Sequence, residues 1–192
     1  MKQAALVLIL FTSCATLKEM TKEPSLYMET VYDKQVRQCS IPVEYFIDQG
    51  VSSAYEAVAH QGFEDWNNKI GIELFVFAGY VDYNPMFETN KGIVVKEEYT
   101  IPGQEDSIAW TRLSITATTG CINYAYINIH KISLFYGYDY SIALTTMHHE
   151  IGHTLGLDHS NLWSDIMYPT WRSKGVISER EIAEVKSVYY KH

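Results

Sequence analysis

The sequence predicts an α/β (α+β) domain in which helices pack on one β-sheet. Segments that alternate apolar and polar residues, as strands do, come before and after segments with helical spacing. Two of the strand-like segments are joined by a turn short enough for a hairpin, which makes that pair antiparallel. With 192 residues, 47% of them hydrophobic and 20% charged, the chain has the composition of one globular domain with one core.

The predicted domain spans residues 39–192, and its first elements are a strand and a helix. Residues 41–47 alternate as a strand does. Ser52 or Ser53 can cap the helix, which ends before Gly71. Further strands are predicted at residues 72–78, 92–96, 108–117 and 122–129.

Two more helices are predicted towards the C-terminus. Residues 140–155 carry an apolar stripe with helical spacing. The stripe consists of Leu144, Met147, Ile151 and Leu155. The last helix follows Ser178, which forms a capping box with Glu181.

The first residues have the pattern of an export signal. The apolar run at residues 4–11 is too short to span a membrane but has the length of a secretory h-region, so residues 1–13 are predicted to be a signal peptide. The segment that follows resembles the lipobox of bacterial lipoproteins, in which Cys14 is acylated and becomes the mature N-terminus. We therefore expect a lipid anchor at the bacterial cell envelope or surface. Ordinary cleavage after Ala15 is the alternative and gives a secreted protein.

The segment between the signal and the domain, residues 14–38, is polar and is predicted to be a tether. Once Cys14 is acylated, two of the three cysteines remain, Cys39 and Cys121, and both lie at predicted strand starts. Whether they form a disulfide stays open. The net charge of −8 and the lack of a basic cluster argue against a nucleic-acid partner. We expect a monomer.

Histidines in the helix predicted at residues 140–155 have the spacing of metal ligands. His149 and His153 are four residues apart, one turn along the helix, close enough to hold one metal ion. Gly156 suits the left-handed conformation that ends a helix, so the chain can turn back and bring His159 as a third ligand. The alternative is a helix whose histidines hold no metal.

The string His149-Glu150-Ile151-Gly152-His153-Thr154-Leu155-Gly156-Leu157-Asp158-His159 resembles the extended zinc signature of the metzincin metalloproteases. Ser160, a Met-turn-like segment at residues 164–169 and the closing helix resemble one branch, the matrixins, which are matrix-metalloprotease-like catalytic domains. The resemblance implies a zincin-like fold. Such a fold has a twisted, mixed five-stranded sheet with one antiparallel edge strand, an active-site helix and a C-terminal helix.

The same resemblance implies a zinc-dependent endopeptidase. One catalytic Zn²⁺ would be held by His149, His153 and His159, and a metal-activated water would attack the peptide bond. Glu150 would be the general base. Met167 would form the apolar floor under the histidines, without a catalytic role.

A protein or peptide substrate would bind along the antiparallel edge strand and in a pocket behind the zinc. The predicted substrate-binding residues are Trp110, Thr111, Arg112 and Leu113 on the strand, and Tyr168, Pro169 and Thr170 at the pocket wall. The sequence has no histidine-rich loop of the kind that would hold a second zinc ion, so only one zinc ion is predicted. Acidic loops could bind calcium through Asp82, Asn84 and Glu88, or through Glu105 and Asp106, although solvation is the plainer interpretation.

Two other functions stay open. One is a catalytically inactive zinc-binding surface interaction protein, and Glu150 argues against it, because a site that only binds metal has no use for that carboxylate. The other is a metal-dependent amidase that acts on cell-wall or small amide substrates.

Overall fold

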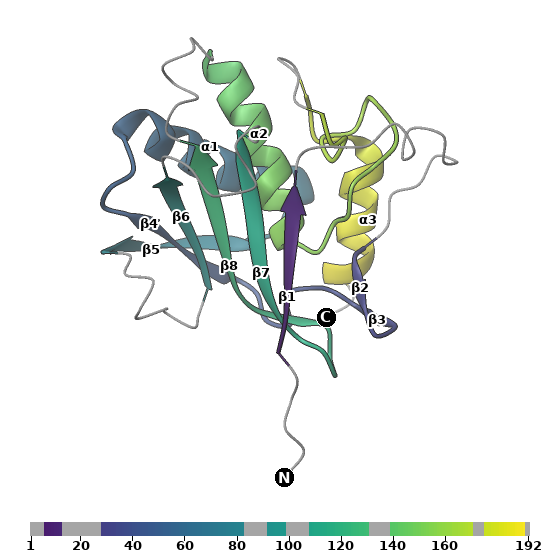
Figure 1. The fold of residues 1–192 in the computed structure, drawn as a ribbon. Helices are drawn as coiled ribbons and strands as arrows, with labels where there is room; N and C mark the ends of the chain where they lie inside the picture. The colour runs from purple at the N-terminus through teal and green to yellow at the C-terminus, as the bar shows by residue number, and fades with distance from the viewer. Residues whose placement is uncertain are drawn as a thin grey trace.

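A computed structural model describes residues 6–12, 28–82, 92–98, 108–130, 139–170 and 175–190 of the chain. Within these ranges, the main sheet has six strands in the order β1-β7-β8-β6-β4-β5, and β2 and β3 form a small second sheet (Figure 1). The strands are β1 (Leu6–Thr12), β2 (Thr30–Val31), β3 (Lys34–Gln35), β4 (Val43–Asp48), β5 (Phe75–Val81), β6 (Gly92–Glu98), β7 (Ala109–Thr116) and β8 (Cys121–His130). The helices are α1 (Ser53–Ile70), α2 (Tyr140–Thr154) and α3 (Glu179–Tyr189).

Strands β4 to β8 form the predicted five-stranded mixed sheet, which is confirmed. β4 is parallel to β5 and β6, β6 is parallel to β8, and β7 is antiparallel to β8 through the hairpin. The strand predicted at residues 72–78 begins later, at Phe75. The reason is Asn67 in α1, whose Oδ1 accepts the backbone N–H groups of Leu74 and Phe75 at 2.9 and 3.0 Å and so holds the turn after the helix.

β1 adds a sixth strand that the sequence analysis did not predict. It pairs antiparallel with the outer edge of β7, with Leu6 opposite Thr116 and Thr12 opposite Trp110. An edge strand presents a row of N–H and C=O groups that can pair with an extended chain, and an apolar run is suited to a strand. Residues 6–11 of the predicted secretory h-region therefore lie along the strand expected to bind substrate.

Helices α1 and α2 pack against each other, and α2 also contacts β7 and β8 (Figure 1). The two helices approach closely at Gly62, where a Cβ atom would lie 2.8 Å from Met147 Cγ. The fully buried Trp66 donates its indole N–H to the carbonyl of His148 at 3.0 Å. None of the helices in the described part of the chain is long and apolar enough to cross a bilayer.

Residues 28–38, which the sequence analysis assigned to the tether, are part of the folded domain. Met28, Val31 and Val36 are buried in the main core, and the backbone of Glu29 donates to Gly156 O at 2.7 Å. The apolar residues of this segment follow no regular period, so the sequence showed no strand or helix there. We call residues 28–38 the strap.

The strap ends at a disulfide between Cys39 and Cys121, the pairing that the sequence left open. Their Cα atoms are 5.3 Å apart, and 82 residues separate them in the sequence. The bond joins the strap to the start of β8. Closing so long a loop removes many conformations from the unfolded chain, so the bond stabilises the folded state.

Replacement of both cysteines, Cys39→Ser with Cys121→Ser, should lower the free energy of unfolding by about 4 kcal/mol, given the 82-residue separation. Urea unfolding under oxidising conditions measures this difference. The reduced parent protein is the control and should unfold like the double variant. If the double variant had the same urea midpoint of unfolding as the oxidised parent, the prediction would be contradicted.

Candidate metal centre

The centre is built on the last two turns of α2 and the turn that follows. α2 carries His149, Glu150 and His153 and ends at Thr154. Gly156 then adopts a φ of +91°, and a Cβ atom there would lie 2.0 Å from the carbonyl oxygen of Val36 in the strap. Glycine is therefore required both by its conformation and by the lack of space. This turn brings the chain back to His159.

The three histidines converge as predicted. Their ligand atoms all lie within 4.8 Å of one another, and the Nε2 atoms of His149 and His153 are 3.1 Å apart. Two nitrogens that bind one zinc ion tetrahedrally are about 3.3 Å apart, because each Zn–N bond is about 2.0–2.1 Å. The spacing of the rings thus fits a zinc site.

The second nitrogen of each helical histidine is fixed by a backbone carbonyl. His149 Nδ1 donates to Ile166 O at 2.8 Å, and His153 Nδ1 donates to Leu157 O at 2.9 Å. A carbonyl can only accept, so in the neutral rings both Nε2 atoms are acceptors. Two acceptors that face each other do not hydrogen-bond, whereas a cation between them satisfies both. The donor set therefore favours a bound metal ion.

Burial keeps His153 and His159 in the neutral form that binds metal. It lowers the pKa of His159 to about 4. The pKa of His153 is lowered well below its ordinary value, first by burial and then by the neighbouring His149 and His159. Protons therefore do not compete with a metal ion for these nitrogens near neutral pH.

Glu150 lies beside the histidines with its side chain almost fully buried, at 2% exposure. Burial raises the pKa of Glu150 to about 8, against the lowering effect of a hydrogen bond from Thr111. The Thr111 hydroxyl lies 2.7 Å from Glu150 Oε2 and connects β7 to the carboxylate. A carboxylate with this pKa can take up and release a proton near neutral pH.

Met167 packs directly under the metal-binding helix. A Cβ atom on Gly152, which lies between the two helical histidines, would be 2.3 Å from Met167 Sδ, so only glycine allows this contact. Met167 is fully buried, and its carbonyl accepts the backbone N–H of Ser160 at 2.9 Å. Met167 is thus placed against the helix between the two histidines, where the apolar floor was predicted.

The Met-turn segment, residues 164–169, is anchored by α3 in a way that the sequence analysis missed. Glu181 was predicted only as half of a capping box, which is present with Ser178. Its buried carboxylate also accepts the N–H groups of Ile166 and Met167 at 3.1 and 2.8 Å. Because Ile166 O in turn accepts from His149, Glu181 supports the orientation of that histidine.

A second anchor to α3 was also missed. Asp165 is buried, and its carboxylate accepts the hydroxyl of Ser160 at 2.5 Å. Arg180 forms an ion pair with Asp165 and donates to Ser160 Oγ at 2.8 Å. These contacts join Ser160 at the start of the loop after His159 to Asp165 at its end, and both to Arg180 in α3. No spacing in the sequence links these three residues.

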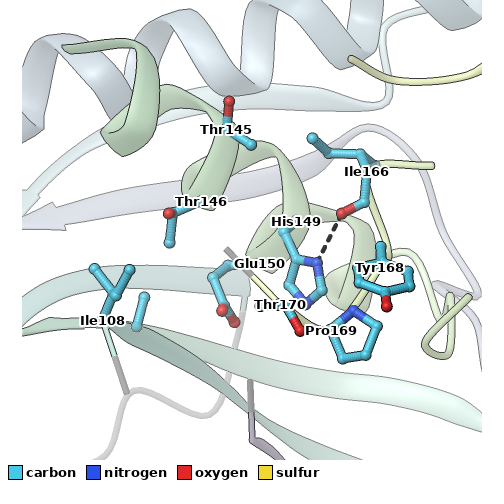
Figure 2. Close-up of a pocket in the computed structure, with 10 residues that line it drawn as sticks. Ile108, Thr145, Thr146, His149, Glu150, Ile166, Tyr168, Pro169 and Thr170 are labelled. Carbon is cyan, nitrogen blue, oxygen red and sulfur yellow. Dashed lines mark hydrogen bonds between the residues drawn. The ribbon is translucent and has the colours of Figure 1, made fainter. Parts of the chain in front are cut away.

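A pocket that is open to solvent lies beside His149 and Glu150. Figure 2 shows Tyr168 and Pro169 next to the His149 ring, with Ile108 at the other end of the pocket. The predicted wall residues Tyr168, Pro169 and Thr170 all line it. Five further residues line the pocket and were not predicted from the sequence: Ile108, Ala109, Thr145, Thr146 and Ile166. The two threonines could have been found, since they lie one helical turn before His149 and Glu150.

The predicted edge-strand residues have different surroundings. The backbones of Trp110, Thr111, Arg112 and Leu113 pair with residues 9–12 of β1. The side chain of Thr111 points to Glu150, and Leu113 is fully buried in the core, so it offers a substrate only its backbone. Among the described residues, the three histidines are the only group of at least three candidate metal ligands.

The candidate calcium ligands are largely untested. Asp82 is exposed, whereas Asn84, Glu88, Glu105 and Asp106 lie outside the described residues. Calcium therefore stays a prediction.

The model of the matrixin family matches residues 48–190, which include the whole metal centre. The match covers more than half of the chain and extends from the end of β4 to the end of α3. No curated protein matches the sequence. Proteins of this family bind zinc, and the three histidines of this chain form a group suited to that ion.

The metal-free protein should lose stability as the pH falls from about 6.5 to about 4. In this window the unfolded chain binds a proton at His159 that the folded chain, with a pKa of about 4 there, does not bind. For this partly exposed side chain we expect a loss of up to about 2 kcal/mol. Urea unfolding at several pH values in the presence of a chelator measures it, and His159→Gln should show a smaller loss. Equal pH dependence in parent and variant would contradict the prediction.

Proposed function

This chain belongs to the matrixin family of zinc-dependent peptidases, and from that membership we propose that it is an endopeptidase that cuts protein or peptide chains. The observation that carries the proposal is the convergence of His149, His153 and His159 beside the buried carboxylate of Glu150. A site that only stored zinc would gain nothing from a buried acid held by Thr111.

His149, His153 and His159 would hold a zinc ion, which would act as a Lewis acid: it would polarise the peptide carbonyl and lower the pKa of water towards about 7. Glu150 takes the proton of the attacking water and passes it to the amine that leaves. Thr111 holds one carboxylate oxygen of Glu150 at 2.7 Å, which keeps the acid on the side of β7. Without a metal ion, burial raises the pKa of Glu150 to about 8. The positive charge of a zinc ion held beside it would lower that pKa and so favour the carboxylate form, which accepts the proton.

We propose that the substrate binds as an extended strand along β7. The antiparallel pairing of β1 supports this, because it occupies the edge that an extended peptide needs. In the proposed mature protein residues 1–13 are removed, and the edge becomes accessible. The pocket beside His149 then receives one substrate side chain, and its lining by Ile108, Ala109, Ile166 and Pro169 favours an apolar one.

The proposed mature protein is exported and attached to the bacterial cell envelope through a lipid on Cys14. Support for export comes from the apolar run before this cysteine. We propose a monomer that acts on protein or peptide substrates and not on nucleic acid, in keeping with its net charge of −8.

Glu150→Gln should bind about one zinc ion per chain, like the parent, but cut an unfolded protein substrate at least about 100-fold more slowly. The amide keeps the size of the side chain and loses the proton acceptor. Glu64→Gln, an exposed position on α1, is the control and should cut like the parent. Elemental analysis gives the zinc content and peptide release gives the rate. An undiminished rate in Glu150→Gln would contradict the mechanism. Release of small amides without cleavage of protein would favour the amidase alternative.

Cys14→Ser should move the protein from the membrane fraction to the soluble fraction of bacterial cells, because it removes the thiol that carries the lipid. Immunoblots of fractionated cells measure the distribution. Glu150→Gln keeps Cys14 and should stay with the membrane. The same distribution for Cys14→Ser and the parent would refute the lipid anchor.

A further inference from the structure

The third histidine of the metal centre is not on a helix, so its position depends on the turn that leads to it. α2 ends at Thr154, and His159 follows only after the left-handed Gly156. Carbonyl groups at the end of a helix have no partner inside the helix. How these carbonyls are bonded therefore determines how firmly the turn is held.

Three consecutive carbonyls at this helix end accept hydrogen bonds from outside α2. The donors are the Gln38 side-chain amide to Thr154 O (2.8 Å), the Tyr189 hydroxyl to Leu155 O (2.9 Å) and the Glu29 backbone to Gly156 O (2.7 Å). Two of the donors lie in the strap and one lies in α3. Segments far apart in the sequence thus meet at this turn.

The turn acts on two of the histidines. Leu157 O accepts the hydrogen bond from His153 Nδ1 at 2.9 Å, and His159 follows two residues later. The Leu157 backbone donates to Gly152 O at 3.1 Å. A shift of the turn would therefore rotate the ring of His153 and displace His159.

Gln38 contributes to this arrangement twice. Besides its side-chain bond to Thr154, its backbone N–H donates to the Tyr189 hydroxyl at 2.9 Å, which orients that hydroxyl towards Leu155 O. Gln38 is only 8% exposed, and the next residue, Cys39, is fixed to β8 by the disulfide. The donor is therefore held in place before any metal binds.

We propose that Gln38 is a positioning residue of the metal site, which fixes the turn between the second and third zinc ligands. The inference rests on the proposed function, because it concerns zinc held by those histidines. Some residues orient the metal ligands without binding the metal themselves. Their loss typically weakens metal binding by about 10-fold to 100-fold. Zinc affinity, and not catalysis, is thus the direct readout.

The test compares two substitutions of Gln38 by competition with a zinc chelator, below the unfolding temperature. Gln38→Met keeps the length of the side chain but removes the donor, and should raise the zinc dissociation constant by about tenfold. Gln38→Lys restores a donor for Thr154 O, and its affinity should lie closer to that of the parent. Gln35→Met, an exposed position in the strap, is the matched control and should bind zinc like the parent.

If Gln38→Met is not folded by circular dichroism, Tyr189→Phe takes its place, since it removes only the hydroxyl that donates to Leu155 O. This variant should also bind zinc more weakly. Parent-like zinc affinity in a folded Gln38→Met or Tyr189→Phe would overturn the inference and leave the proposed function intact. A parent protein that binds no zinc would overturn the proposed function and this inference with it.

Discussion

The metal centre depends on two hydrogen bonds that fix the second nitrogen of each helical histidine. His149 donates to Ile166 O and His153 donates to Leu157 O, so both rings present an acceptor nitrogen to the same point. The accepting carbonyls belong to different segments, the Met-turn and the turn after α2. The helix alone cannot orient its ligands, and both loops must be in place.

Most of the structure around the centre holds these two loops. The Met-turn is fixed from below by Glu181 and by the close packing of Met167 on Gly152. The turn after α2 is held by the strap and by Tyr189. Glu181 and Tyr189 belong to α3, at the C-terminal end of the domain, and the strap lies at its N-terminal end. The N-terminal strap and the C-terminal helix are therefore parts of the metal centre.

The sequence predicted the elements that follow from local periodicity and spacing. The five strands from β4 to β8, the metal-binding helix and the capping box at Ser178 belong to this class. The histidine spacing and Gly156 depend on helix geometry, which is why the convergence of the ligands could be expected. The strap, the contacts of Glu181 with the Met-turn and the pairing of β1 with β7 join residues distant in sequence. No periodicity encodes such contacts, and a polar composition concealed the buried residues of the strap.

X-ray absorption at the zinc edge of the zinc-loaded protein tests the central claim most directly, because it identifies the atoms bound to the ion. We expect one zinc per chain with three imidazole nitrogens at about 2.0–2.1 Å, and the loss of one imidazole in each of three single substitutions, at His149, His153 and His159. A zinc ion bound mainly by carboxylate or thiolate groups, or a spectrum unchanged by these substitutions, would contradict it.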